Sequence, residues 1–83
     1  MNLYEYEFVS VCPVDGDEVR YYLTIETNRV IPAEDIRAAC ARHGRNLHEP
    51  IAFDLDRALP GKQTLVAMHR GVRITTIRGR TGA

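Results

Sequence analysis

Two short stretches hold the residues that could do chemistry: Cys12 in one, and His48 with Glu49 in the other. Cys12 precedes Pro13, which cannot donate a ladder hydrogen bond and favours an extended conformation in the residue before it. We therefore expect the Cys12 thiol at the mouth of a β-strand, where it meets solvent and can act as a nucleophile. The acidic residues that follow Cys12 disfavour its negatively charged thiolate. A cation from elsewhere in the fold must therefore stabilise the thiolate, and His48 is the candidate.

Glu49 lies between His48 and Pro50, directly before an apolar segment. Two interpretations of this carboxylate are open. It could cap the N-terminus of a helix, where backbone N–H groups lack partners. It could instead bind substrate, because a carboxylate accepts two hydrogen bonds from adjacent N–H groups of a guanine- or pterin-like ring.

Ordinary packing is the competing explanation for the cysteines, because a free cysteine is a small hydrophobic residue in most proteins. Cys12 and Cys40 are 28 positions apart and form no paired motif, and the three histidines lack the spacing of metal ligands. We therefore expect no metal. In a reducing compartment we expect two free thiols rather than a disulfide.

Composition limits the class of protein. The 83 residues are expected to form a single domain, residues 1–83, with a frayed end at 79–83. Lys plus Arg and Asp plus Glu both number 11, so net charge does not favour nucleic acid as a partner. No apolar run has the length of a membrane span and no secretory signal is present, which predicts a cytoplasmic protein with no membrane contact. Four Tyr, two Phe and no Trp make a thin core, and we expect a homo-oligomer.

The elements that must position these residues follow from hydrophobic periodicity. Alternating residues predict β-strands over 3–11, 19–26, 63–69 and 72–78. A helix is predicted over 32–43, beginning at Pro32 and ending near Gly44, whereas residues 49–59 fit either a helix or a strand. The order is β-β-α-(α or β)-β-β, which predicts an α+β domain with an antiparallel sheet packed on one or two helices.

Two motifs resemble a known family: Phe8-x-Ser10-x-Cys12-Pro13-x-x-Gly16 and His43-Gly44-x-x-Leu47-His48-Glu49 are similar to segments of the nitrile reductases of queuosine biosynthesis. These 7-cyano-7-deazaguanine reductases have the tunnelling fold, shared with GTP cyclohydrolase and pterin synthases, and contain a β-β-α-α-β-β unit. The resemblance implies a second helix over 49–59 and sites built between subunits. It also implies that Cys12 adds to the nitrile carbon of 7-cyano-7-deazaguanine, and that Glu49 anchors the base with His48 beside it.

This chain differs from the family pattern at positions that take part in the family's reaction. Val19 stands where the family has an Asp that is thought to transfer a proton. The segment from Val30 to Ala33 stands where the family has the charged segment that handles NADPH, so we expect no hydride transfer and no cofactor. Leu47 replaces the usual Phe, and one extra residue precedes His48. Relatives that lack the NADPH segment act as amidinotransferases on a nitrile in tRNA, so nucleophilic chemistry does not require it.

Two function classes remain. The first is a small tunnelling-fold protein that binds a deazapurine- or pterin-like ring, with Cys12 and His48 as candidate catalytic residues and Glu49 as the substrate-binding residue. The second is a non-catalytic α+β module that binds another protein, of a kind found in phages and mobile elements. Oligomeric state distinguishes them, because tunnelling-fold sites need several chains.

Overall fold

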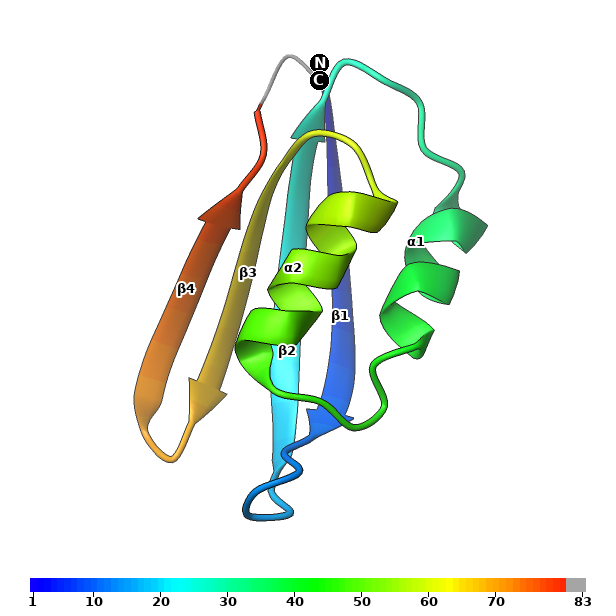
Figure 1. The fold of residues 1–83 in the computed structure, drawn as a ribbon. Coiled ribbons are helices and arrows are strands. Elements are labelled where there is room, and N and C mark those ends of the chain that lie inside the picture. Colours follow the sequence, from blue (N-terminus) through cyan, green and yellow to red (C-terminus); the bar gives the residue numbers. More distant parts are fainter. Residues whose placement is uncertain (81–83) are drawn as a thin grey trace.

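The computed structural model describes residues 1–80. The element order is β1 (Asn2–Val11), β2 (Glu18–Thr27), α1 (Ala33–Ala41), α2 (His48–Ala58), β3 (Lys62–His69) and β4 (Val72–Arg78). The four strands form one antiparallel sheet in the order β1-β2-β3-β4 (Figure 1). This α+β arrangement confirms the predicted order. Residues 49–59, which the sequence pattern left as either a helix or a strand, fall almost entirely in the helix α2.

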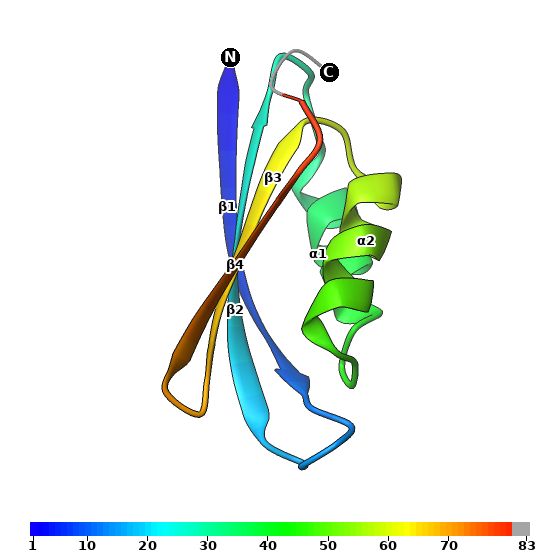
Figure 2. The same cartoon turned by 60° about the vertical axis from the view of Figure 1, so that its left-hand side comes forward.

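Both helices pack on the same face of the sheet, and the other face carries no helix (Figure 2). The alternation predicted for β2 holds: every second residue from Val19 to Thr27 is buried. The strand register continues this face across the sheet, since Leu23 pairs with Tyr6 on one side and Leu65 on the other. Burying each Leu or Ile side chain contributes about 1.5–3 kcal/mol. The core therefore lies between β2, β3 and the helices.

The apolar residues of α2 settle the helix-or-strand ambiguity. Ile51 and Leu55 are one helical turn apart and both are buried, whereas Phe53, which a strand would place beside them, is half exposed. The Phe53 ring lies instead against the guanidinium groups of Arg57 and Arg78, with 5.6 and 5.4 Å from its centroid to the two guanidinium carbons. Burial of one helical face therefore decides the conformation of this segment.

Helix α1 is shorter than the predicted range 32–43. Pro32 is the extended residue before the helix, and Arg42 ends it. The side chain of His43, which follows the helix, is buried, with Nε2 2.7 Å from Oδ2 of Asp54 on α2. The contact with Asp54 explains why the chain turns inward after Ala41. The predicted frayed end at 79–83 includes residues 81–83, which lie outside the described residues.

The bare face of the sheet has large exposed side chains. These are Leu3 and Val9 on β1, Tyr22 on β2, Met68 on β3 and Ile77 on β4. β1 and β4 are edge strands, so each presents a row of backbone groups that pair with no strand of the described chain. Within residues 1–80, no helix has both the length and the apolar character needed to cross a bilayer.

Candidate functional site

Three chain segments meet at one end of the sheet: the β1–β2 loop, the β3–β4 turn and the loop that leads into α2 (Figures 1 and 2). They enclose a cavity of about 170 Å³. Its lining comprises Cys12, Val19, Tyr21, Asn46, Leu47, His48, Ala67, His69 and Ile74. The structure thus brings together Cys12 and His48, the two residues that the sequence singled out as catalytic candidates.

The loop before α2 is fastened to the end of β1. The backbone N–H of Val11 donates to the carbonyl of Gly44 at 2.9 Å, and the N–H of Asn46 donates to Oγ of Ser10 at 3.0 Å. Ser10 is fully buried, so its hydroxyl is a fixed acceptor. These two bonds place the first residue of α2, His48, beside the cavity.

Cys12 is buried, with 6% of its surface exposed, so the expectation that its thiol meets solvent is wrong for the single chain. The turn that follows explains this placement: the Cys12 N–H donates to the carbonyl of Asp17 at 2.8 Å, and its carbonyl accepts from Gly16 N–H at 2.8 Å. This closed turn faces the thiol inward. Cys40 is a buried free thiol in α1, and burial raises its pKa to about 11.

Two basic side chains, at the end of β3 and in the turn that follows it, approach the acidic residues after Cys12. His69 Nε2 lies 2.9 Å from Oδ2 of Asp15, and Arg70 Nε lies 2.8 Å from Oδ2 of Asp17. The backbone N–H of Asp17, which donates to Asp15 at 2.9 Å, is the main cause that lowers the pKa of Asp15. The sequence named His48 as the partner of the Cys12 thiolate. The structure places His48 on the same cavity as Cys12, and His69 and Arg70 at the neighbouring carboxylates.

Cys12, Asp15 and His69 each present one ligand-type atom, and these atoms lie within 4.8 Å of one another. Sulfur, nitrogen and oxygen at such spacing are the donor set that Zn²⁺ prefers, and the sequence spacing did not indicate it. Asp15 is exposed, however, and its carboxylate already lies 3.2 Å from Arg70. The contacts with His69 and Arg70 account for the position of the Asp15 carboxylate.

His48 begins α2 and its ring packs on Tyr21, with centroids 5.4 Å apart. Its Nε2 lies 2.9 Å from Oγ1 of Thr76 on β4, and its buried Nδ1 has no hydrogen-bond partner among the described residues. Burial lowers the pKa of His48, partly opposed by the negative charge of Glu49. A neutral imidazole beside the cavity is therefore favoured near neutral pH.

Glu49 lies in the first turn of α2 and is exposed in the single chain. It makes no capping hydrogen bond, because the N-cap residue is Leu47 and no side chain caps this helix. The hydroxyl of Thr76 donates to its Oε1 at 3.3 Å. Of the two interpretations from sequence, the hydrogen-bonded cap is therefore wrong, although Glu49 still complements the helix dipole.

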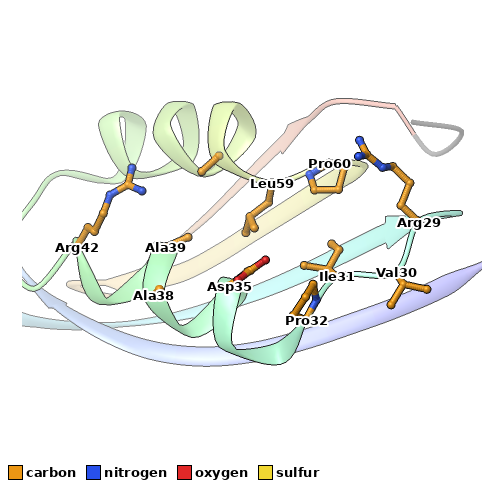
Figure 3. A pocket seen from close by; sticks show the side chains of 11 residues that line it. Arg29, Val30, Ile31, Pro32, Asp35, Ala38, Ala39, Arg42, Leu59 and Pro60 are labelled. Carbon is orange, nitrogen blue, oxygen red and sulfur yellow. The ribbon is translucent and has the colours of Figure 1, made fainter.

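A second hollow of about 370 Å³ lies between the two helices and the loops beside them. Figure 3 shows Arg29 and Arg42 at its opposite ends, with Asp35 between them. Most of its other lining is small or apolar, and it contains none of the candidate residues. It has neither a thiol nor an imidazole, so the nucleophile hypothesis concerns the first cavity alone.

Sequence reasoning missed Thr76, His69 and Arg70 as members of the site. The alternation of β4 placed Thr76 on one face, but only the register, in which Thr76 pairs with Leu65, places it on the helix-covered face. The two-residue turn at Arg70 and Gly71 was predicted, and both residues have positive φ, 51° and 82°. Its proximity to the β1–β2 loop depends on the sheet order.

No protein-family model matches this chain, and no curated protein matches it. Among solved structures, the crystal structure of the archaeosine synthase QueF-Like in the apo form is similar. The TM-score is 0.70, and the match covers 99% of this chain and 94% of that chain at 21% sequence identity. At that identity the likeness shows the fold, and it confirms the tunnelling fold that the two motifs implied.

Proposed function

We propose that this chain binds a deazapurine- or pterin-like ring in the cavity beside Cys12, and that the Cys12 thiol adds to a nitrile on that ring. The observation that carries the proposal is that Cys12 and His48, 36 positions apart, line one cavity, with Glu49 linked to His48 through Thr76. The similarity of the fold to an archaeosine synthase supports it.

Each residue has a distinct role in this proposal. The Cys12 sulfur forms a bond to the nitrile carbon, and the thiol proton passes to the nitrile nitrogen, so nothing leaves. Neutral His48 accepts a hydrogen bond at the cavity wall. Glu49 accepts hydrogen bonds from ring N–H groups, which selects rings that present donors.

A second copy of the chain completes the site. The cavity of about 170 Å³ is smaller than the roughly 300–1,000 Å³ of typical ligand pockets. Glu49 is exposed in the single chain, and each of the two edge strands has a side that pairs with no strand of the described residues. A homo-oligomer joined through its sheet edges would enclose Glu49 and enlarge the cavity.

The reaction uses no NADPH. Ile31, in the segment where the family has its cofactor residues, is buried, and its N–H donates to the Tyr4 hydroxyl at 3.0 Å. The other residues of the segment, Val30, Pro32 and Ala33, are exposed and carry no charged or polar side chain that could hold a phosphate. The protein works in the cytoplasm, where both cysteines remain thiols.

Mass spectrometry of the intact protein after incubation with 7-cyano-7-deazaguanine tests the nucleophile. Addition without a leaving group predicts an adduct with the full mass of the ring compound. Cys12→Ser should abolish the adduct and Cys40→Ser should retain it. No adduct on the wild type, or an adduct that persists in Cys12→Ser, would show that Cys12 is not the nucleophile. Calorimetry would then test ring binding separately.

A non-catalytic protein-interaction module is the second candidate function. The observation that favours it is the bare face of the sheet, where Tyr22 and Met68 are about half exposed, with Leu3 and Ile77 more so. In this case the protein would be a monomer that captures a different chain. The solution mass described in the Discussion separates the two functions.

A further inference from the structure

Thr76 on β4 contacts both His48 and Glu49, the first two residues of α2. Its Oγ1 lies 2.9 Å from Nε2 of His48 and 3.3 Å from Oε1 of Glu49. It lies on β4, on the helix-covered face, while both partners lie in the first turn of α2. No motif in the sequence points to this residue.

Counting protons assigns the direction of both hydrogen bonds. An ionised carboxylate only accepts, and a hydroxyl has a single proton to donate. In the bond at 3.3 Å the Thr76 proton goes to Glu49, and while that bond is made the Thr76 oxygen can only accept from His48. That bond requires the proton of the imidazole to sit on Nε2.

We infer that Thr76 is a positioning residue that holds neutral His48 in its Nε2–H tautomer, so that Nδ1 is a bare acceptor for a donor group on the bound ring. Nδ1 is buried and has no hydrogen-bond partner among the described residues. An unpartnered buried acceptor costs free energy, which a ligand N–H or O–H would recover. Burial of His48, which lowers its pKa, is consistent with the neutral form.

This tautomer limits the ring ligands to those that present hydrogen-bond donors, an inference that rests on the proposed function. His48 Nδ1 and the Glu49 carboxylate both accept and cannot donate. A ring edge with adjacent N–H and NH₂ donors satisfies them, as the amidine-like edge of a guanine or pterin does. A ring that presents only acceptors would leave two protein acceptors facing lone pairs, and it should bind more weakly.

The tautomer can be measured without any ligand, from the ring-nitrogen chemical shifts of His48 in nitrogen-labelled wild-type protein near neutral pH, with His48→Gln to assign the signals. We expect a protonated Nε2 and an unprotonated Nδ1. Thr76→Val keeps the β-branched shape and removes the hydroxyl, and it should shift the His48 signals toward a mixture of tautomers. Thr76→Ser should restore the wild-type pattern. Thr75→Val, on the bare face of the same strand, is the matched control and should leave the pattern unchanged.

Two results would overturn the inference: a wild-type His48 protonated on Nδ1, or a folded Thr76→Val protein with the wild-type shifts. If Thr76→Val does not fold, the wild-type spectrum still decides the tautomer, and Thr76→Ala, which also lacks the hydroxyl, decides the hydroxyl's part in it. The proposed function fails separately. A protein with the Nε2–H tautomer that binds no deazapurine or pterin refutes ring binding and leaves the role of Thr76 intact.

Discussion

The backbone N–H of Asn46 donates a hydrogen bond to Oγ of Ser10 at 3.0 Å, and this contact joins positions 36 residues apart in the sequence. Ser10 is fully buried at the end of β1, and Asn46 lies in the loop that leads into α2. The contact, with the neighbouring bond from Val11 to Gly44, fixes how His48 meets the cavity.

Ser10→Ala should therefore loosen the site as well as the fold. The variant leaves the Asn46 N–H without its partner, and a buried unsatisfied donor costs about 1–3 kcal/mol. We expect the free energy of unfolding to fall by that amount in denaturant titrations. We also expect Cys12 to be alkylated faster, because the loop that helps line its cavity is released. Thr75→Ala, which removes an exposed hydroxyl, is the control; equal stability of the two variants would show that the Ser10 contact is unimportant.

The two cysteines should differ in reactivity. Cys40 is 2% exposed on the inner face of α1, and burial raises its pKa to about 11, so at neutral pH it is a protonated, inaccessible thiol. Cys12 lines a cavity next to a surface turn and should be alkylated first. Brief treatment with iodoacetamide followed by peptide mass spectrometry ranks them. Faster labelling of Cys40 would make Cys12 a packing residue.

Gly61→Ala should be far more destabilising than Gly71→Ala. Both glycines have positive φ, 95° and 82°, so both substitutions carry backbone strain of about 1–2 kcal/mol. At Gly61 an added Cβ would also lie 2.6 Å from the carbonyl oxygen of Glu26, whereas at Gly71 nothing lies within 4 Å. Thermal melting of both variants measures the difference. Equal losses of stability would mean that the end of β2 and the start of β3 can move apart with little loss of folding free energy.

Much of this fold could be predicted from the sequence, because local pattern and burial agree. In β2 every second residue is apolar, and the structure buries that set. The pattern could not decide between helix and strand in residues 49–59. Ile51 and Leu55 have the spacing of one helical face, but Ile51, Phe53 and Leu55 also alternate as they would in a strand. Tertiary packing excludes the strand, because the helix buries Ile51 and Leu55 and leaves Phe53 half exposed.

The site was less predictable than the fold. Cys12 and His48 were identified from the motifs they share with a known family, and the structure places both at one cavity. Thr76, His69 and Arg70 reach the site through strand register and the order of the sheet, which are tertiary features. The burial of Cys12 likewise depends on the turn at Asp17 and on the loop that covers it.

The chain should be a cyclic homo-oligomer in solution. β1 and β4 each have an edge that pairs with no strand within residues 1–80, and the bare face exposes large apolar side chains. Light scattering coupled to gel filtration at high micromolar concentration should give a mass several times that of the 9.4 kDa chain. A monomer would favour the protein-interaction module over the ring-binding function.

Ligand titration of Glu49→Gln tests the central claim most directly. The substitution keeps the shape and sets an NH₂ donor against a ring N–H, which leaves buried groups unpaired at about 1–3 kcal/mol. At about 1.4 kcal/mol per tenfold change, affinity for 7-cyano-7-deazaguanine should fall at least several-fold by calorimetry. The melting temperature should stay nearly unchanged, because Glu49 is exposed and makes no capping hydrogen bond.

Glu34→Gln is the matched control, since Glu34 occupies the first turn of α1 and lies away from the cavity. It should bind the ring as the wild type does. The account predicts wild-type binding that Glu49→Gln weakens and Glu34→Gln preserves, with similar melting curves for all three proteins. A wild-type protein that binds no such ring, together with a Glu49→Gln variant that only melts earlier, would contradict it.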